Sequence, residues 1–428
     1  MSIDNRVAIP KIDTAKIDAL AARIQALPLD IRWAAADEAI IAAVASGAKG
    51  TEGPVSRRVR ALLERASRVG LAYPLVRVLS FVQLLRLWLR QRRAVGGRHS
   101  VRTNSGRLFI GIRALKEKEL RPHYEARVGG PAAYVDQREE LCLCEIARPT
   151  WWALQAAWRD AGHTALAALR FGRIPLPEAS VLTSLARRWH AYAYFLACFR
   201  EIGAAVLKGP IGFSTADLSA YAAVAAGLDA VYYQHGFLRR SLVFPDFVEV
   251  VGFNAPEIAH LTERLPRTVA CLVSPRLEDW VPARRLVVVG DYIEREALPT
   301  RELIEACRAK GIDIVVRPHP ADKVEHWRAW GDADGVWVDH EGTFSEFLAR
   351  HRPAVVATWF STAMFEAALM GAVPVTLAAE AADIVFPFHR LALRWPSERA
   401  RILRVFDDPE TRVGALASAR SVAIGAPA

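Results

Sequence analysis

Arg285-Leu286-Val287-Val288-Val289-Gly290 opens the stretch of sequence that decides the fold. A run of apolar residues closed by glycine is typical of a buried strand. From here to residue 376 the pattern predicts strict alternation of helices and strands, which indicates parallel strands, right-handed crossovers and a doubly wound sheet. The predicted helices are 300–310, 322–330, 343–350 and 361–370, and the further strands are 312–316, 335–338, 354–357 and 372–376.

A less regular unit of the same kind precedes this one. Ser214 and Asp217 have the spacing of a capping box and indicate a helix start. Residues 266–284 contain three prolines and are predicted to be an irregular linker. The predicted strands are 107–113, 132–135, 140–145, 204–207, 230–233 and 247–253, and the predicted helices are 153–170, 180–202, 220–227 and 256–265.

A chain of 428 residues is too long for one simple core. We therefore expect an α/β protein with two Rossmann-like, doubly wound domains and a helical N-terminal extension. The expected boundaries are 1–98 for the extension, 99–275 for the first Rossmann-like domain and 284–410 for the second.

Composition indicates an ordinary soluble protein. The five cysteines show no metal-ligand spacing and are expected to be reduced thiols. The N-terminus lacks the pattern of a signal peptide, and the longest apolar stretch, Leu71–Leu89, is interrupted by Pro74, Arg77 and Arg86. We expect a cytoplasmic protein, free or peripheral on the inner membrane.

Basic residues exceed acidic ones, 56 to 46, which favours anionic partners. The excess is concentrated in residues 56–95, where arginines alternate with apolar residues at helical spacing. One interpretation is a basic helix on the inner membrane surface. The other is a helix packed on the core with a solvated arginine face. Nucleic acid is not expected, because no recognised binding motif accompanies the charge.

Two histidines follow predicted strands: His235 in Tyr232-Tyr233-Gln234-His235-Gly236, and His319 in Arg317-Pro318-His319-Pro320. Ligands of open α/β sheets bind beyond the carboxyl ends of the strands. We therefore expect the two histidines to lie on two walls of one cleft.

In the second unit, the strand ends indicate phosphate binding. Gly290 and Asp291 end its first strand, where glycine lets a phosphate approach the backbone. Pro318 and Pro320 restrict the loop that carries Arg317 and His319, so an anion would meet pre-arranged groups. The alternative is that His319 caps a neighbouring carbonyl.

The segment from Ser361 to Glu366 gives a second phosphate signal. Ser361 and Thr362 stand at a predicted helix start, where hydroxyls and backbone N–H groups can meet a phosphate. Glu366, one turn later, could reach a ribose hydroxyl. The alternative is a plain N-cap by Ser361, with Glu366 as an early acid favoured by the helix dipole.

In the first unit, His235 is the candidate general base, since an imidazole titrates near neutral pH. The alternative is a structural histidine bound to a backbone carbonyl. The predicted contacts to the acceptor or to an anion share the strand ends of this unit: Asp217, Gln234, Gly236, Arg239 and Arg240.

The order of His235-Gly236, the Arg317–Pro320 motif, Ser361-Thr362 with Glu366, and Gly371-x-x-Pro374-Val375 resembles GT-B glycosyltransferases of bacterial surface polysaccharides. The most similar families use cytidine-activated donors: CDP-glycerol glycerophosphotransferases and capsule Kdo- and polysialyl-transferases. The resemblance covers roughly residues 203–378. It implies a GT-B-like fold whose domains face a cleft. By this resemblance His319, Ser361 and Thr362 hold the nucleotide phosphates, Glu366 holds the ribose, and His235 acts as base or acceptor contact.

Two departures accompany the resemblance. The acidic motif of polysialyltransferases is not evident, and the first 100 residues match no family. Asp332-Ala333-Asp334 has the spacing of a metal-bound site but precedes a strand, which places it at the opposite end of the sheet, so neither a metal nor a cofactor is expected.

The sequence therefore predicts a metal-independent glycosyltransferase that moves a sugar or polyol phosphate from a cytidine-activated donor, such as CMP-Kdo or CMP-sialic acid, to an anionic glycan or lipid-linked acceptor of a capsule or surface polysaccharide. Two alternatives stay open. One is a nucleotide-sugar 2-epimerase of the same fold, and the other is a non-catalytic scaffold for polysaccharide assembly.

Overall fold

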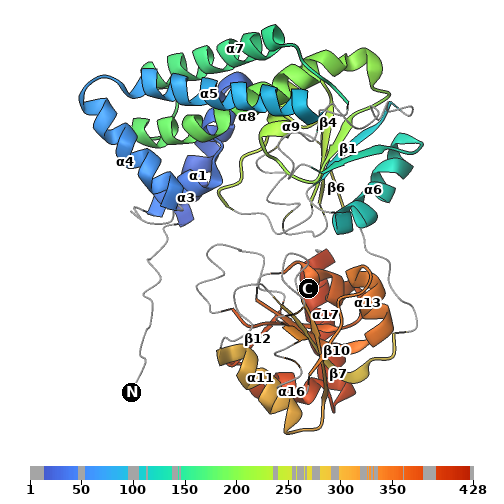
Figure 1. Ribbon diagram of the computed structural model, residues 1–428. Helices are drawn as coiled ribbons and strands as arrows, with labels where there is room; N and C mark the ends of the chain where they lie inside the picture. Colours follow the sequence, from blue (N-terminus) through green and yellow to red (C-terminus); the bar gives the residue numbers. More distant parts are fainter. Residues whose placement is uncertain are drawn as a thin grey trace. The chain divides into compact units, whose positions relative to one another are not determined.

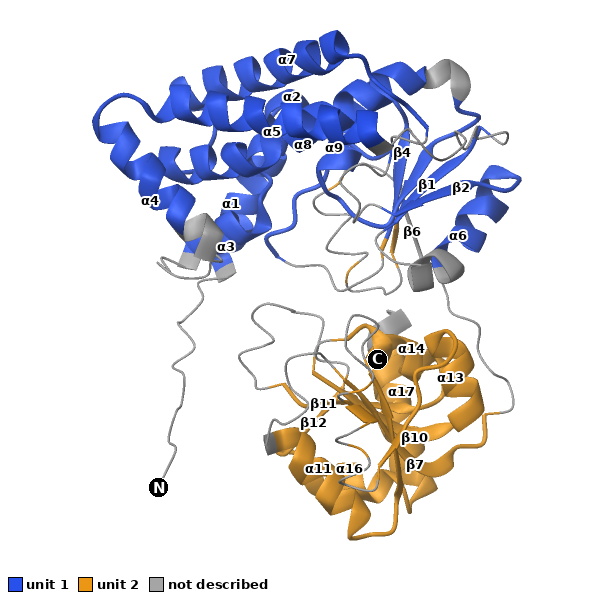
Figure 2. Ribbon diagram, in the orientation of Figure 1, with its two compact units in different colours: residues 1–233, 239–250, 266–268 blue, residues 234–238, 251–265, 269–428 orange. Residues whose placement is uncertain are grey.

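The chain forms two compact units in a computed structural model (Figures 1 and 2). The first comprises residues 1–233, 239–250 and 266–268, and the second comprises 234–238, 251–265 and 269–428. The structure describes residues 14–46, 54–94, 106–111, 114–136, 143, 146–234, 240–252, 257, 265, 268–271, 280–290, 298–318, 325, 327–328, 331, 336–359, 361–378 and 392–424.

The second unit contains a six-stranded sheet in the order β12-β11-β10-β7-β8-β9. Numbered within the unit, this is the Rossmann order 3-2-1-4-5-6, read from the opposite edge. Each neighbouring pair in this sheet is parallel. Its strands are β7 (Ala283–Val289), β8 (Asp313–Arg317), β9 (Trp337–Val338), β10 (Pro353–Thr358), β11 (Val373–Thr376) and β12 (Leu393–Arg394).

Helices cover both faces of this sheet, because alternate residues of β7 point to opposite sides. Leu286 and Val288 share a core with α11 (Leu298–Arg308) and α16 (Arg399–Val405). Val287 and Val289 pack with α13 (Phe344–His351) and α14 (Ala363–Met370). A last helix, α17 (Pro409–Ile424), contacts α14 and α16. The apolar runs therefore form strands buried on both faces, as the sequence predicted.

The first sheet also has six strands, in the order β2-β1-β3-β4-β5-β6. Strand β1 pairs in parallel with β2 and β3, and β3 pairs in parallel with β4. Its direction of winding reverses between β1 and β3. The strands are β1 (Leu108–Gly111), β2 (Ala133–Asp136), β3 (Ile211–Phe213), β4 (Ala230–Tyr233), β5 (Glu249–Gly252) and β6 (Thr268–Cys271).

The two sheets confirm the predicted α/β class with two Rossmann-like parts. A GT-B-like fold is built from two such parts. The shared cleft stays a prediction, as do the exact domain boundaries.

A layer of helices belongs to the first unit (Figures 1 and 2). Gln25 and Phe244 exchange hydrogen bonds, and the buried Arg32 donates to the Phe244 carbonyl at 3.0 Å and to Asp246 at 2.6 Å. These contacts fix the N-terminal helices to the loop before β5. The helices of this unit are α1 (Thr14–Gln25), α2 (Leu29–Ala35), α3 (Glu38–Ser46), α4 (Pro54–Arg68), α5 (Ala72–Ala94), α6 (Ala114–Val128), α7 (Trp151–Arg170), α8 (Glu178–Val206) and α9 (Leu218–Ala225).

Helix α5 has an unusual composition for this layer. Residues Ala72–Arg93 are long and apolar enough to cross a membrane by length and composition, with a mean hydropathy of 1.3, and only 28% of the apolar window is buried. The helix still contains Pro74, Arg77 and Arg86, the residues that interrupt its apolar sequence. Helix α5 nevertheless packs on α4, α7 and α8 and is part of the helical layer of the first unit.

Two predictions of secondary structure are wrong. Residues 204–207 are not a strand, because α8 runs to Val206 across a kink at Gly203 and the strand forms later, at Ile211–Phe213. A run of four apolar residues fits a strand and a buried helix equally well. The predicted linker contains β6 and the start of β7. Most of the predicted elements 140–145, 256–265 and 322–330 lies outside the described residues.

Candidate functional site

The winding of the second sheet reverses between β7 and β10, which is where open α/β sheets bind ligands. Val289 of β7 is in register with Arg317 of β8 on one side and with Thr358 of β10 on the other. The carboxyl ends of these three strands therefore meet at one edge. Four residues that the sequence predicted separately lie at this edge or directly after it: Gly290, Arg317, Ser361 and Thr362.

The turn from β10 into α14 is closed by hydroxyl groups. The Thr358 hydroxyl accepts from the Ser361 N–H at 3.3 Å, and the Ser361 hydroxyl accepts from the Ala363 N–H at 3.2 Å. Ser361 therefore lies one residue before the N-cap position, and the interpretation of Ser361 as a plain N-cap is wrong in its position. Thr362 occupies the N-cap position with helical backbone angles and accepts no capping hydrogen bond. Both side chains are half-buried. Their contact with a phosphate stays a prediction.

Glu366 lies in the first turn of α14 and is half-buried. It follows Thr362 by four residues, so the two share one face of the turn. Its backbone N–H donates to the Thr362 carbonyl at 3.4 Å. The placement is compatible with a ribose contact, which stays a prediction.

Arg317 is buried, with 5% of its surface exposed. Its Nη1 donates to the Glu341 carbonyl at 2.8 Å and its Nη2 to the Gly342 carbonyl at 2.5 Å. The guanidinium also lies 5.0 Å from the ring centre of Phe347. Arg317 therefore ties the end of β8 to the loop before α13. An anion at this side chain would compete with two carbonyl groups that already hold it.

The same loop is held by a buried cluster around Asp339. This carboxylate accepts from Arg350 at 2.7 Å and lies 2.7 Å from His351 Nε2. Burial would raise the pKa of Asp339, but hydrogen bonds from His351, the Glu341 N–H and Arg350 lower it overall. Burial lowers the pKa of His351, and the neighbouring Asp339 offsets this only in part. Both shifts make the fold more stable at neutral pH than at acid pH.

Gly290 has a packing role that the sequence did not reveal. A Cβ atom at this position would lie 2.3 Å from Cζ2 of Trp327, whose ring is 1% exposed. Its N–H donates to the Arg317 carbonyl at 2.8 Å. Glycine is thus needed for the approach of Trp327, whether or not a phosphate also binds here.

In the first sheet, the reversal of winding is followed by Ser214 and Asp217. Ser214 is buried and its N–H donates to the Ile110 carbonyl at 3.0 Å. Asp217, not Ser214, is the N-cap of α9, so the predicted capping box is wrong. The Asp217 carboxylate accepts from the N–H and hydroxyl of Ser219 at 3.1 and 2.9 Å. Burial raises the pKa of Asp217.

Two further predicted contacts already have protein partners. Gln234 is buried and its amide donates to the carboxylate of Glu257, which is fully buried. Arg240 forms an ion pair with Asp18 of α1. The sequence predicted no role for Glu257, and only the tertiary structure shows its burial.

Six predicted site residues lie outside the described residues: His235, Gly236, Arg239, Asp291, His319 and Pro320. Within the described part of the chain, no group of three or more His, Cys, Asp or Glu side chains could hold a metal ion. Independence from metals and cofactors stays a prediction.

No family model matches the sequence, and no curated protein matches it. Among solved structures it is similar to TarM, at 8% identity and a TM-score of 0.37, over 54% of this chain and 55% of that one. The chain thus spans about half the length of TarM. It is also similar to the UDP-GlcNAc 2-epimerase of Methanocaldococcus jannaschii, at 9% identity and a TM-score of 0.38, over 72% of this chain and 91% of the other. A third similar structure is Medicago truncatula UGT71G1 complexed with UDP-glucose, at 11% identity and a TM-score of 0.36, over 75% and 96% of the two chains.

Proposed function

We propose that the chain is a GT-B glycosyltransferase whose donor nucleotide binds at the carboxyl edge of the second sheet. The observation that carries the proposal is the reversal of winding between β7 and β10, which joins three strand ends to the start of α14. Ser361, Thr362 and Glu366 supply two hydroxyls and a carboxylate there. The order of motifs described above favours a cytidine-activated donor and a surface-glycan acceptor.

The described residues divide into supports and ligand contacts. Arg317 holds the loop before α13 through two carbonyl groups, and the Ser361 hydroxyl accepts from the Ala363 N–H at the start of α14, so both keep the edge in shape. Thr362 and Glu366 are the side chains that we assign to the nucleotide. The positive end of α14 favours the negative charge that develops on the leaving phosphate.

The reaction proceeds by attack of an acceptor hydroxyl on the donor. The new bond forms from the acceptor oxygen to the transferred group. The bond from that group to the nucleotide phosphate breaks, and the phosphate leaves with the bonding electrons. We assign removal of the hydroxyl proton to His235, on the sequence argument that an imidazole near neutral pKa suits this task.

The first experiment measures nucleotide binding by calorimetric titration of the full chain with CMP, CDP, UDP and GDP. We expect a cytidine nucleotide to bind most tightly. Thr362→Ala should weaken binding about tenfold, the loss of roughly one hydrogen bond to a charged group. Ser361→Ala is the matched variant, because it removes the hydroxyl that accepts from the Ala363 N–H and should lower stability. Failure of all four nucleotides to bind would contradict the proposal.

The second experiment identifies the reaction. The chain is incubated with CMP-Kdo, CMP-sialic acid or CDP-glycerol, with and without a glycan acceptor, and nucleotide release is measured. We expect release that depends on the acceptor and falls at least 100-fold in His235→Ala, while nucleotide affinity is kept. An epimerised sugar formed without acceptor would instead identify the enzyme as an epimerase.

A further inference from the structure

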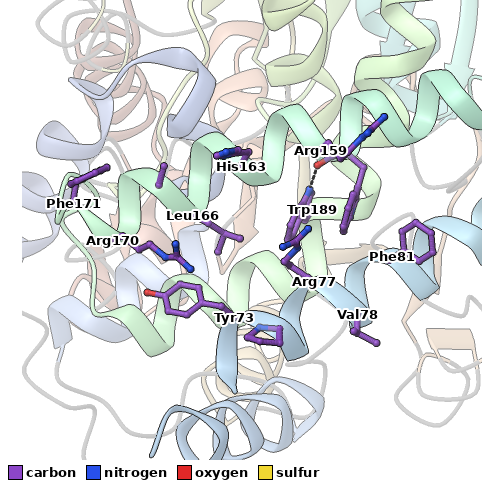
Figure 3. A pocket seen from close by; sticks show the side chains of 13 residues that line it. Tyr73, Arg77, Val78, Phe81, Arg159, His163, Leu166, Arg170, Phe171 and Trp189 are labelled. Atoms are coloured by element: carbon purple, nitrogen blue, oxygen red, sulfur yellow. Dashed lines mark hydrogen bonds between the residues drawn. The ribbon is translucent and has the colours of Figure 1, made fainter. Parts of the chain in front are cut away.

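A groove between α5 and α7 lies in the helical layer of the first unit (Figure 3). Its volume is about 950 Å³, within the size range of small-molecule sites. Tyr73 and Arg77 come from α5, and Leu166 and Arg170 come from α7; Figure 3 shows these four side chains around the groove. Trp158 and Trp189 form its aromatic floor. The proposed glycosyltransferase chemistry uses none of these residues.

The floor is rigid because its two indole rings are fixed to each other and to α5. Trp158 and Trp189 stack with ring centres 4.7 Å apart and planes 6° from parallel. Trp189 Nε1 donates to the Trp158 carbonyl at 2.8 Å, and Trp158 Nε1 donates to the Ser80 hydroxyl at 2.9 Å. An apolar surface is therefore held open in a fixed shape.

Two of the arginines that line the groove, Arg77 and Arg170, lie over aromatic rings, and Arg159 also lines it. Arg170 of α7 lies 5.0 Å from the ring centre of Tyr73 on α5, and Arg77 of α5 lies 6.0 Å from that of Trp158 on α7. Both arginines are exposed, and the residues that line the groove include no carboxylate. Outside the lining, Glu178 is hydrogen-bonded to the hydroxyl of Tyr73 and raises its pKa. The groove thus combines an apolar floor with an uncompensated positive charge.

The surface around the groove has the same character. In the described part of the chain, eight of the eleven exposed large hydrophobic residues lie between residues 62 and 89 or at the ends of α7. Val78 beside the groove is 59% exposed and Phe171 is 80% exposed. Helices α4 and α5 contain ten arginines against a single acid, Glu64. Protein surfaces that bind anionic membranes combine apolar and cationic side chains in this way.

We propose that this groove binds an anionic phospholipid at a membrane surface. The phosphate lies at Arg77 and Arg170, and the hydrocarbon chain lies along Leu166 and Trp158. Helix α5 lies on the membrane rather than crossing it. Its Ser80 accepts a buried hydrogen bond from Trp158, and its Val76 and Leu84 are fully buried, so crossing would break the packing of the unit.

The test is co-sedimentation of the full chain with vesicles of phosphatidylcholine alone or with 30% phosphatidylglycerol. The wild type should bind the anionic vesicles, and salt should weaken the binding. The double variant Arg77→Gln/Arg170→Gln should bind about 10- to 30-fold more weakly, as two surface arginines are lost. Arg301→Gln/Arg328→Gln removes two exposed arginines from the second unit and should bind like the wild type. Equal binding to both kinds of vesicle, or full binding by the first double variant, would overturn the proposal.

A second pair of variants separates a lipid in the groove from general attraction to charge. Leu166→Trp and Ala167→Leu both fill the groove and leave every charge in place. At least one of them should bind short-chain dihexanoyl-phosphatidylglycerol about tenfold more weakly, the loss of part of one buried chain. Inorganic phosphate at the same concentration should not compete. Unchanged lipid binding by both folded variants, or displacement by phosphate, would overturn the assignment to the groove.

Nucleotide binding is measured on the same variants. It should stay unchanged, so a failure of the lipid proposal is distinguishable from a failure of the proposed donor site.

Discussion

The arginine of the Arg-Pro-His-Pro motif and the arginines of the α5–α7 groove lie in opposite environments. Arg317 is buried and donates to two backbone carbonyl groups. Arg77 and Arg170 are exposed and lie over aromatic rings. The first side chain is used to hold a loop, whereas the other two keep their charge available to a ligand. A motif thus identifies where a side chain is, and only its partners show what it does.

Among the predictions, the largest loss of stability is expected for Gly162→Ala on α7, which lies beside the aromatic floor of the α5–α7 groove. The new Cβ atom would lie 1.4 Å from Cζ2 of Trp189, which is 1% exposed and cannot move without losing its stacking on Trp158. We expect a loss of about 3 kcal/mol in unfolding free energy, the upper end of overpacking. Urea unfolding followed by tryptophan fluorescence measures it.

Gly414→Ala on α17 is the matched control, since nothing lies within 4 Å of the added atom. It should leave stability unchanged or raise it by up to about 1 kcal/mol, because alanine favours a helix over glycine. Similar effects of the two substitutions would show that Trp189 is not fixed as described.

On the other side of the comparison, Arg317→Met should destabilise the second unit by about 1 to 2 kcal/mol. It removes both hydrogen bonds of the buried guanidinium to the loop before α13, although Arg350 still donates to the Glu341 carbonyl at 3.1 Å. Arg301→Met removes an exposed arginine from α11 and should change stability by less than about 0.5 kcal/mol. Chemical unfolding of both variants measures the difference. If they unfold alike, Arg317 is not the anchor of this loop.

Asp339 beside that loop predicts a dependence on pH. Its pKa is lowered in the fold, so its contribution is complete above the unfolded pKa of about 3.9 and is lost as the pH falls through the folded pKa. Asp339→Asn should lower stability at pH 7 by about 1 to 2 kcal/mol and flatten the pH dependence below pH 4. Asp313→Asn, at an exposed ion pair with Arg285, is the control and should do neither. Unfolding measured from pH 7 to 3 tests this. If Asp339→Asn lost stability below pH 4 as steeply as the wild type, the prediction would be wrong.

The fold could be read from the sequence where strands are buried on both faces. Val287 and Val289 face one core and Leu286 and Val288 the other, so the whole run is apolar and its limits are clear. The run at 204–207 failed because it is too short to show a period, and a kink at Gly203 lets the helix continue through it. Local pattern alone cannot decide such a case.

The strand ends of the candidate site could be placed from the sequence, but the contacts of their residues could not. Gly290, Arg317 and Ser361 were assigned to one edge, and the register of β7, β8 and β10 brings the three strand ends together. Their partners are distant in the chain: Trp327 for Gly290, and the 341–342 carbonyl groups for Arg317. Gln234 and Glu257 form a similar pair, whose burial no local pattern indicates.

The smallest expected effect on stability completes the comparison. Arg77→Gln/Arg170→Gln removes two cation–π contacts at exposed positions, which should lower the unfolding free energy by no more than about 1 kcal/mol. The same double variant is expected to lose most of its binding to anionic vesicles. For Arg317→Met we expect the opposite: a clear loss of unfolding free energy and little change in vesicle binding. Measuring unfolding and vesicle binding on both variants therefore distinguishes an arginine that holds the protein together from one that holds a ligand. A large loss of stability in the double variant would place Arg77 and Arg170 in the first class and remove the reason for assigning a lipid to them.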